Sequence, residues 1–316
     1  MIKKQTSKNG LVELFRFLCS IWVAYYHGFF PILSEEFDGV NISVDFFFMV
    51  SGFFFLKSIQ KHKDKPIWHG IKYIFWGRTK SFIVPLVIAA LSILSCNIMF
   101  ELDFGGFNWP LSFLWFFAAQ FTFLSLLYLL SKSLRSNAAF NIACAVVICI
   151  SMSLVIFMSD SFARQFDRVF RAPAMLALGI LISQIPKISI KLKNEKKAKV
   201  ISLLMNAFGF AISAVGFIYL AYLPGYSTLK AHFFTCIVCP ALLYFATALP
   251  VHSKLLNLLG EISIFIYLAQ CPILLHYYGG TGNTKDQFVW LCVYATGLFA
   301  INRIINYIIS KKRAIA

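Results

Sequence analysis

Long apolar runs alternate with short polar segments along almost the whole chain. A helix needs about 20 predominantly apolar residues to cross the hydrocarbon core of a bilayer. Ten runs of spanning length can be placed, near residues 11–33, 40–59, 80–100, 109–131, 138–158, 169–185, 200–222, 229–250, 258–277 and 287–309. The pattern predicts an all-α, polytopic membrane protein with about ten transmembrane helices, and it indicates one transmembrane domain that occupies residues 1–316.

Composition and charge agree with this interpretation. Hydrophobic residues make up 59% of the chain and charged residues only 13%. With the N-terminus in the cytoplasm, ten crossings place residues 1–8, 57–80 and 187–199 on the cytoplasmic side, and these segments with the C-terminal tail hold most of the 29 Lys and Arg. Basic residues are enriched in the cytoplasmic loops of membrane proteins. We therefore expect cytoplasmic N- and C-termini, contact with membrane lipid, and no nucleic-acid partner despite the net charge of +16.

Arg16 and His27 lie within the first apolar run. Arg16 and His27 are eleven residues apart, a spacing that returns a helix to within about 20° of its starting direction and covers about 16 Å. An ionisable side chain at bilayer depth costs roughly 2.5–3.5 kcal/mol, so it is rare without a function. The spacing predicts that both residues share one helix face, with Arg16 near the cytoplasmic surface and His27 near the opposite one. This arrangement suits a long anionic molecule whose reactive end must reach across the membrane.

Asp45 lies near the start of the second apolar run, which enters the membrane on the side where the first one leaves it. We expect Asp45 at a depth similar to that of His27. A carboxylate there can accept a hydrogen bond from one imidazole nitrogen and leave the other nitrogen as a base. The alternative is that Asp45 caps the start of its helix among the lipid headgroups.

These residues belong to motifs that resemble the acyltransferase 3 family, integral-membrane enzymes that acylate bacterial surface sugars. Arg16 and His27 match its motif of an arginine, ten residues and a histidine. The segment SVDFFFMVSGFFF resembles its second-helix signature, with Asp45, Ser51 and Gly52 in place. The segments LWFFAAQ and GEISIFIYLAQCPIL are similar to its later helices.

The chain departs from the family pattern at two places. The arginine-rich run before the third helix corresponds here to WGRTKSFIVP, which has Arg78 and Lys80 but lacks a further arginine. Gln270 stands where the late motif usually has a histidine. A glutamine can hydrogen-bond a substrate but cannot act as a base.

The resemblance implies transfer of an acyl group, most simply acetyl from cytoplasmic acetyl-CoA, to a sugar hydroxyl of a lipid-linked or cell-surface polysaccharide at the bacterial inner membrane. His27 would be the general base and Asp45 would orient it. The other expected site residues are those that bind the donor (Arg16, Arg78 and Lys80) and candidate oxyanion or acceptor contacts (Ser51, Tyr267 and Gln270). Anchoring at the cytoplasmic surface is an equally good explanation of Arg78 and Lys80.

Several alternatives remain open at this stage. A transporter or flippase for a glycan or small molecule could use His27 and Asp45 as a proton relay. No Ser or Cys is paired with His27 by spacing, so direct transfer is preferred to an acyl-enzyme. Cys236 and Cys239 form a CxxC without a second pair, and we expect packing rather than a metal site. His62 falls in the connector 57–80, where a solvated side chain is expected.

Overall fold

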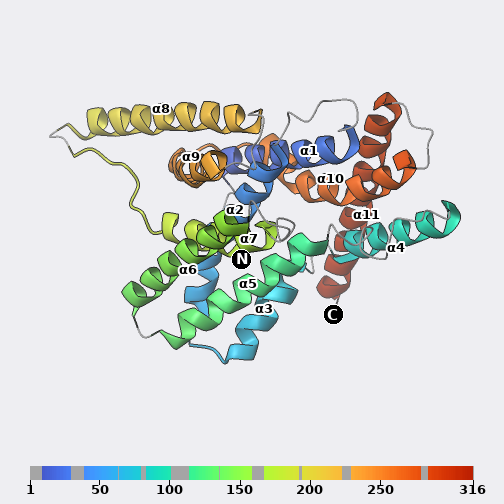
Figure 1. Cartoon of the computed structure of the whole chain (residues 1–316), viewed down its shortest axis with the longest axis horizontal. Coiled ribbons are helices and arrows are strands. Elements are labelled where there is room, and N and C mark those ends of the chain that lie inside the picture. The colour runs from blue at the N-terminus through green and yellow to red at the C-terminus, as the bar shows by residue number, and fades with distance from the viewer. Residues whose placement is uncertain are drawn as a thin grey trace.

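The computed structural model describes residues 9–29, 39–62, 64–79, 83–100, 114–134, 136–158, 167–191, 194–222, 229–278 and 284–315. Within these residues the chain forms eleven α-helices and no β-strand (Figure 1). The helices are α1 (Gly10–Phe29), α2 (Gly39–His62), α3 (Ile67–Thr79), α4 (Ile83–Phe100), α5 (Leu114–Ser133), α6 (Asn137–Met158), α7 (Asp167–Ile182), α8 (Glu195–Ala221), α9 (Leu229–Ala248), α10 (Lys254–Tyr278) and α11 (Thr284–Ile315). The all-α prediction is therefore confirmed for this part of the chain.

Ten of these helices coincide with the ten apolar runs, and α3 is the additional one. Four helices are long and apolar enough to cross a membrane when only the described residues are considered, namely α5, α6, α8 and α11. Shorter apolar stretches lie in α7 and α9. The number of crossings, the cytoplasmic position of both termini and the single-domain organisation stay predictions.

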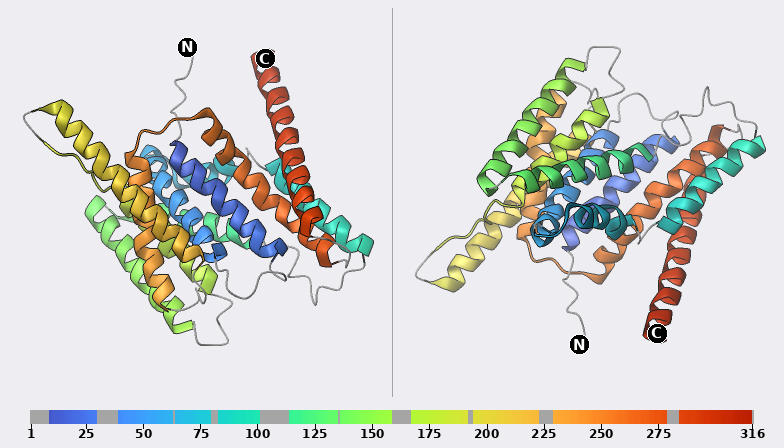
Figure 2. Two further views of the ribbon diagram at one scale, coloured as in Figure 1. Left: turned by 90° about the horizontal axis from the view of Figure 1, so that it is seen from above. Right: turned by 90° about the horizontal axis from the view of Figure 1, so that it is seen from below.

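Neighbouring helices run in the directions that alternating crossings require. Two helices are parallel where the residue numbers of their contacts rise together. For α1 this holds with α10 (Gly10–Leu256, Glu13–Gly260) and with α8 (Phe15–Phe210, Trp22–Tyr222). For α2 it holds with α7 (Asp45–Arg171, Gly52–Leu176) and with α5 (Phe48–Trp115, Ser51–Gln120). Antiparallel pairs are defined by Gly209–Phe245 and Gly216–Val238 (α8 with α9), and Glu261–Arg303 and Phe265–Phe299 (α10 with α11). The first turn of α1 and the last turns of α11 lie toward the same side of the molecule (Figure 2).

Asn9 fixes the start of α1 against the end of α9. Its side-chain oxygen accepts hydrogen bonds from the backbone N–H groups of Leu11 and Val12 (3.1 and 3.2 Å), which caps α1. Its side-chain amide donates to the carbonyl oxygens of Ala246 and Leu249 (2.9 and 2.8 Å) at the end of α9. One side chain therefore satisfies the backbone of two helix ends and sets the height at which α1 enters the bundle.

Two glycines bring α2 and α7 into close contact. A Cβ at Gly52 would overlap the backbone of Leu176, and a Cβ at Gly179 would overlap the backbone of Met49. Small residues at an interface let helix backbones approach closely, and this packing replaces the hydrophobic driving force that is missing between helices in lipid. The second-helix motif thus contains a packing residue beside its polar ones.

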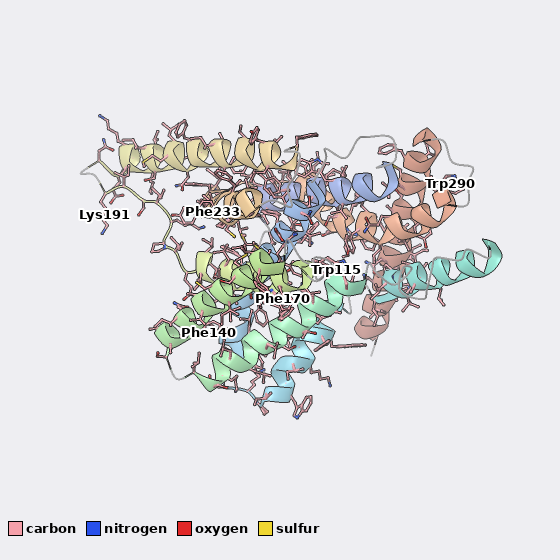
Figure 3. The ribbon with its side chains drawn as sticks, viewed as in Figure 1. Trp115, Phe140, Phe170, Lys191, Phe233 and Trp290 are labelled. Carbon is pink, nitrogen blue, oxygen red and sulfur yellow. The ribbon has the colours of Figure 1, made fainter. Side chains whose placement is uncertain are left out.

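Apolar side chains cover the outer surface as well as the core. Phe157 is 80% exposed and Phe208 69% exposed, and the outward faces carry Phe233 and Trp290 (Figure 3). A soluble monomer rarely exposes contiguous apolar patches of this kind, whereas lipid is a suitable environment for them. The distribution agrees with an integral membrane protein.

The connector 57–80 is not a simple loop, because it contains α3. This helix lies along α5 (Figure 1), where Gly70 packs against Tyr128 and the rings of Phe75 and Phe121 are 5.1 Å apart. These two contacts show that α3 runs antiparallel to α5. The segment was missed because its lysines interrupt the apolar pattern on which the prediction rested.

His62 is also not the solvated residue that its place in the connector predicted. Its side chain is buried and its ring stacks on Tyr73 at 4.3 Å between centroids. The hydroxyl of Tyr128 donates to the His62 carbonyl oxygen at 3.1 Å. The junction between α2 and α3 is therefore a packed corner supported by α5.

Candidate active site

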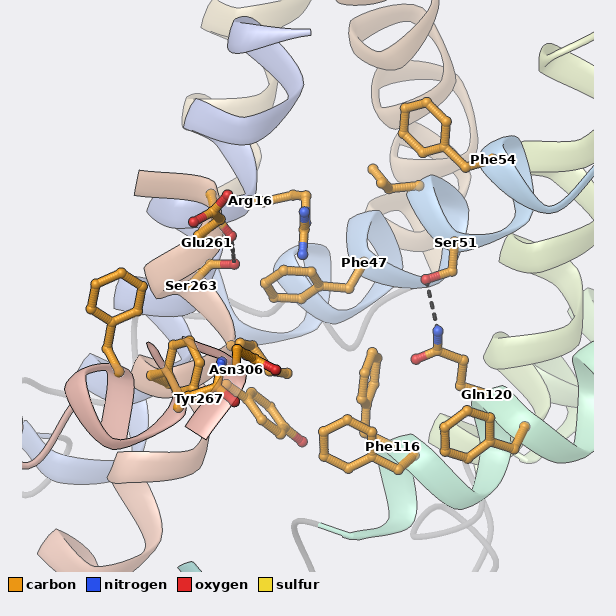
Figure 4. Close-up of a pocket in the computed structure, with 18 of the residues that line it drawn as sticks. Arg16, Phe47, Ser51, Phe54, Phe116, Gln120, Glu261, Ser263, Tyr267 and Asn306 are labelled. Atoms are coloured by element: carbon orange, nitrogen blue, oxygen red, sulfur yellow. Dashed lines mark hydrogen bonds between the residues drawn. The ribbon is translucent and has the colours of Figure 1, made fainter. Parts of the chain in front are cut away.

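A cavity of about 620 Å³ lies between α1, α2, α5, α10 and α11 (Figure 4). Most of its wall is aromatic or aliphatic, and the phenylalanines that line it are Phe47, Phe54, Phe116, Phe117, Phe121, Phe265 and Phe299. The polar side chains that line it are those of Arg16, Ser51, Gln120, Glu261, Ser263, Asn302, Arg303 and Asn306. An apolar cavity with a few converging polar groups is typical of a small-molecule site.

Arg16 projects from α1 and lines this cavity. Its guanidinium group donates to the carboxylate of Glu13, one turn earlier, at 2.8 Å. Glu13 lies against Gly260 of α10, where a Cβ would overlap the carboxylate. The carboxylate is thus enclosed between two helices, while the Arg16 side chain, which lines the cavity, is 29% exposed.

His27 lies on the same helix as Arg16. Since α1 is continuous from Gly10 to Phe29, the two positions are on one face and about 16 Å apart along the axis, as the spacing predicted. The side chain of His27 lies outside the residues that the structure describes, so its catalytic role stays a prediction.

Asp45 is buried between α2 and α7, where it accepts two hydrogen bonds from Arg171. The Nε and Nη2 atoms of Arg171 lie 3.0 and 2.8 Å from its Oδ1 atom. Arg171 also donates to the side-chain and backbone oxygens of Asn41 (3.1 and 3.0 Å). Because α2 begins at Gly39 and Asp45 is buried, the alternative of a cap among the headgroups is wrong.

The contacts between α1 and α2 do not support the direct hydrogen bond expected between Asp45 and His27. The helices cross where Phe15 contacts Phe46 and where the Cys19 thiol reaches the Ser43 hydroxyl. Asp45 lies at this crossing. His27 is eight residues beyond Cys19, which is about 12 Å along α1, so the pairing of the two catalytic candidates stays a prediction without geometric support.

Ser51 lines the cavity from α2. Its hydroxyl accepts a hydrogen bond of 3.0 Å from the side-chain amide of Gln120 on α5 (Figure 4). Since a serine hydroxyl both donates and accepts, this bond leaves its hydrogen available for a ligand in the cavity. Gln120 was not singled out from the sequence, although it ends the LWFFAAQ segment.

Tyr267 and Gln270 occupy successive turns of α10. Tyr267 lines the cavity, and its ring lies 5.5 and 5.9 Å from those of Phe116 and Phe117. Gln270 is buried one turn further along the helix, and its Oε1 atom has no hydrogen-bond partner within the part of the chain that the structure describes. A buried acceptor of this kind is uncommon in proteins.

The backbone of Arg78 lies in the last turn of α3. The contacts of Gly70 with Tyr128 and of Phe75 with Phe121 carry this turn to the level of Phe117, which lines the cavity. The Arg78 side chain and the whole of Lys80 lie outside the described residues, so their donor-binding role stays a prediction.

A family model described as an acyltransferase domain, that of acyltransferase 3, matches residues 9–306. The chain belongs to the acyltransferase 3 family. The match extends over nearly the whole sequence and includes every residue that lines the cavity. Searches of curated proteins and of solved structures gave no significant match.

Family membership and the apolar helices support an acyltransferase embedded in a membrane. In this acyltransferase, three charged residues of interest were missed from the sequence, namely Arg171, Glu261 and Arg303. Arg171 stands at the start of an apolar run, and that signal could have identified it in the way that Arg16 was identified. Glu261 and Arg303 are 42 residues apart, and only the antiparallel packing of α10 and α11 brings them together.

Proposed function

We propose that the protein transfers an acyl group, most simply acetyl, from acetyl-CoA to a hydroxyl of a lipid-linked or cell-surface polysaccharide in the bacterial inner membrane. The observation that carries the proposal is the position of Arg16. It belongs to the arginine and histidine motif of an acyltransferase 3 member and lines a cavity of about 620 Å³. A volume of this size is within the range of small-molecule sites.

Binding of the donor falls to Arg16, Arg78 and Lys80. Guanidinium groups pair with phosphate through two parallel hydrogen bonds, and an ammonium group adds a point charge. The aromatic wall beyond Arg16 suits the less polar arm that carries the thioester. The donor would enter from the end of the bundle where α1 and α10 begin.

His27 removes the proton from the acceptor hydroxyl while its oxygen attacks the thioester carbonyl. The new C–O bond forms, the C–S bond breaks, and the thiolate leaves and takes the proton back from the imidazolium. An imidazole with a pKa near 6.5 suits this exchange, and general-base catalysis contributes about 10²- to 10⁴-fold. Asp45, which is paired with Arg171, is kept as the candidate carboxylate that orients the imidazole.

The developing oxyanion needs hydrogen-bond donors at the cavity wall. Ser51, Tyr267 and Gln270 each carry such a donor, and Ser51 and Tyr267 line the cavity. Removal of one oxyanion donor in other enzymes lowers kcat by about 10²- to 10³-fold. The contribution of each donor to kcat can therefore be measured separately in Ser51→Ala, Tyr267→Phe and Gln270→Leu.

The test uses purified full-length protein, labelled acetyl-CoA and membranes from the host as the source of acceptor. We expect transfer of label by the wild type, loss of transfer in His27→Ala and Arg16→Ala, and normal transfer in His252→Ala, a matched control at an exposed histidine. Mass spectrometry of the surface polysaccharide reports the acyl mass and the acceptor. Flux of a glycan without covalent change would instead identify a transporter, and full transfer by folded His27→Ala would remove the base.

A further inference from the structure

The last helix brings a second arginine to the cavity. Arg303 lies in the apolar stretch Phe288–Ile309 of α11, and both it and Glu261 line the cavity that Arg16 lines. Arg303 donates to the Glu261 carboxylate at 2.7 Å, and its guanidinium group lies 5.2 Å from the centre of the Phe299 ring. A cation in an apolar span is rare without a function.

The two arginines reach the cavity at the same turn of α10. Glu13, which pairs with Arg16, packs against Gly260. The next residue, Glu261, pairs with Arg303. Two guanidinium groups from α1 and α11 therefore lie at one depth of the cavity, near the end of the bundle where α1 and α10 begin.

In both pairs the arginine is the more exposed partner. Arg303 is 58% exposed against 37% for Glu261, and Arg16 is 29% exposed against 7% for Glu13. Within the described residues, each guanidinium group makes a single hydrogen bond. Since a guanidinium group has five N–H donors, most of the donors of both arginines remain for a ligand.

Neutral groups extend this polar end of the cavity. Asn302 and Asn306 lie beside Arg303 on α11 and line the cavity (Figure 4 labels Asn306). Two cations and two amides at one end, with an aromatic wall beyond, fit a ligand that has two or more phosphate groups at one end and a less polar arm at the other.

We propose that Arg303 and Arg16 together bind the phosphates of the acyl donor, and that Glu261 is the counter-ion of Arg303 only while the cavity is empty. This assignment rests on the proposed function and adds a donor-binding residue on α11 that the sequence did not indicate. Phosphate oxygens replace the Glu261 carboxylate as acceptors when the donor enters. The carboxylate then lies beside the bound anion and weakens its binding.

The proposal predicts opposite effects from the two partners. Arg303→Gln raises the Kd of CoA by about tenfold, because it removes charge-assisted hydrogen bonds to phosphate. Glu261→Gln lowers the Kd by about threefold, because it removes a competing negative charge at a partly exposed position. Both changes shrink at high salt, which screens exposed charges. If the Arg303–Glu261 pair only stabilised the packing of α10 against α11, both variants would lower the melting temperature and neither would lower the Kd of CoA.

The experiment measures binding of radiolabelled CoA to the full-length protein in detergent, with the KM for acetyl-CoA and the melting temperature of each variant. Lys311→Gln is the matched control, because it removes a cation from the same helix at a position that does not line the cavity. Farnesyl diphosphate serves as a second probe, since a lipid diphosphate offers the same phosphate chemistry from a different source.

The outcomes separate this inference from the proposed function. Acetyl transfer with an unchanged Kd and KM in Arg303→Gln overturns the role of Arg303 alone, and so does weaker CoA binding in Glu261→Gln. Absence of both CoA binding and acetyl transfer in the wild type overturns the proposed function together with this inference. An effect of Arg303→Gln on farnesyl diphosphate but not on CoA assigns the arginine to a lipid diphosphate and overturns the donor assignment.

Discussion

The ion pairs Asp45–Arg171 and Glu13–Arg16 have the same N–O distance, 2.8 Å, but their arginines differ in exposure. The side chain of Arg171 is 2% exposed, whereas that of Arg16 is 29% exposed. With described residues, Arg171 makes four hydrogen bonds, two to Asp45 and two to Asn41. Arg16 makes one within the described residues.

The difference separates a charge that stabilises the fold from a charge that is available to a ligand. A buried cation must have most of its donors satisfied by the protein, because an unpaired buried charge is strongly destabilising. A cation at a cavity wall can leave donors to solvent or substrate. Distance alone therefore does not show which intramembrane arginine is functional, and exposure with the count of hydrogen bonds does.

The largest effect is expected at the buried pair. Arg171→Met leaves the Asp45 carboxylate buried without its cation, which should destabilise the protein by about 3–5 kcal/mol. The double variant Asp45→Leu with Arg171→Met removes both charges and should recover most of that stability. Thermal unfolding in detergent measures both variants. A single variant as stable as the wild type would show that the pair does not hold α2 against α7.

A smaller effect is expected where α1 meets α10. Gly260→Ala places a methyl group on the Glu13 carboxylate, and such overpacking typically costs about 1–3 kcal/mol. Displacing Glu13 also moves the partner of Arg16, so the KM for acetyl-CoA should change. Gly297→Ala on α11 is the control, because a Cβ there meets nothing within 4 Å. Equal melting temperatures and KM values for the two variants would contradict the close packing of Glu13.

Arg16 should affect stability less than Arg171 does, and donor binding more. Arg16→Gln breaks a partly exposed pair, for which about 0–1 kcal/mol of stability is expected. The KM for acetyl-CoA should rise about tenfold or more, since hydrogen bonds to a charged group are lost. Arg16→Lys keeps the charge but loses the planar guanidinium group, so its KM for acetyl-CoA should lie between those of the wild type and Arg16→Gln. Strong destabilisation by Arg16→Gln would place Arg16 with Arg171 instead.

The smallest effect concerns Lys187, in the connector after α7. Its Nζ atom donates to the Tyr244 carbonyl oxygen and to the Thr247 hydroxyl (2.9 and 2.6 Å), and burial lowers the pKa of Lys187 to about 8. Between that value and the ordinary pKa of about 10.4, the unfolded state binds more protons than the folded state. Stability should therefore rise slightly with pH in this window. The rise is measured as the difference in melting temperature from Lys187→Met, and an identical pH dependence would contradict it.

Much of the fold could be predicted because membrane helices leave a strong local signal. The ten apolar runs correspond to ten helices, and the spacing of Arg16 and His27 on one helix follows from helix geometry alone. The helix α3 was missed, because Lys72 and its basic neighbours made the segment look like a connector. Only the tertiary structure shows that its apolar residues Ile74 and Phe75 belong to a helix that packs near α5.

The site could be predicted only where its residues carry their own signal. Arg16 is unusual within an apolar run, and the cavity contains it. Asp45 was identified as a polar residue of α2, but its expected pairing with His27 depends on how α1 and α2 cross, and tertiary contacts decide that crossing. Its partner Arg171 is 126 residues away, and a single sequence gives no sign of that pairing.

The hydrogen bonds from Asn9 to Ala246 and Leu249 join parts of the chain that are 237 and 240 residues apart. At about 5–20 residues per second during synthesis, roughly 12–50 s pass between synthesis of α1 and synthesis of the end of α9, which α1 packs against. The arginine of α1 has to be tolerated throughout that interval. Glu13 lies three positions before Arg16 on the same helix. The charge of Arg16 can therefore be neutralised within α1 before α9 and α10 have been synthesised.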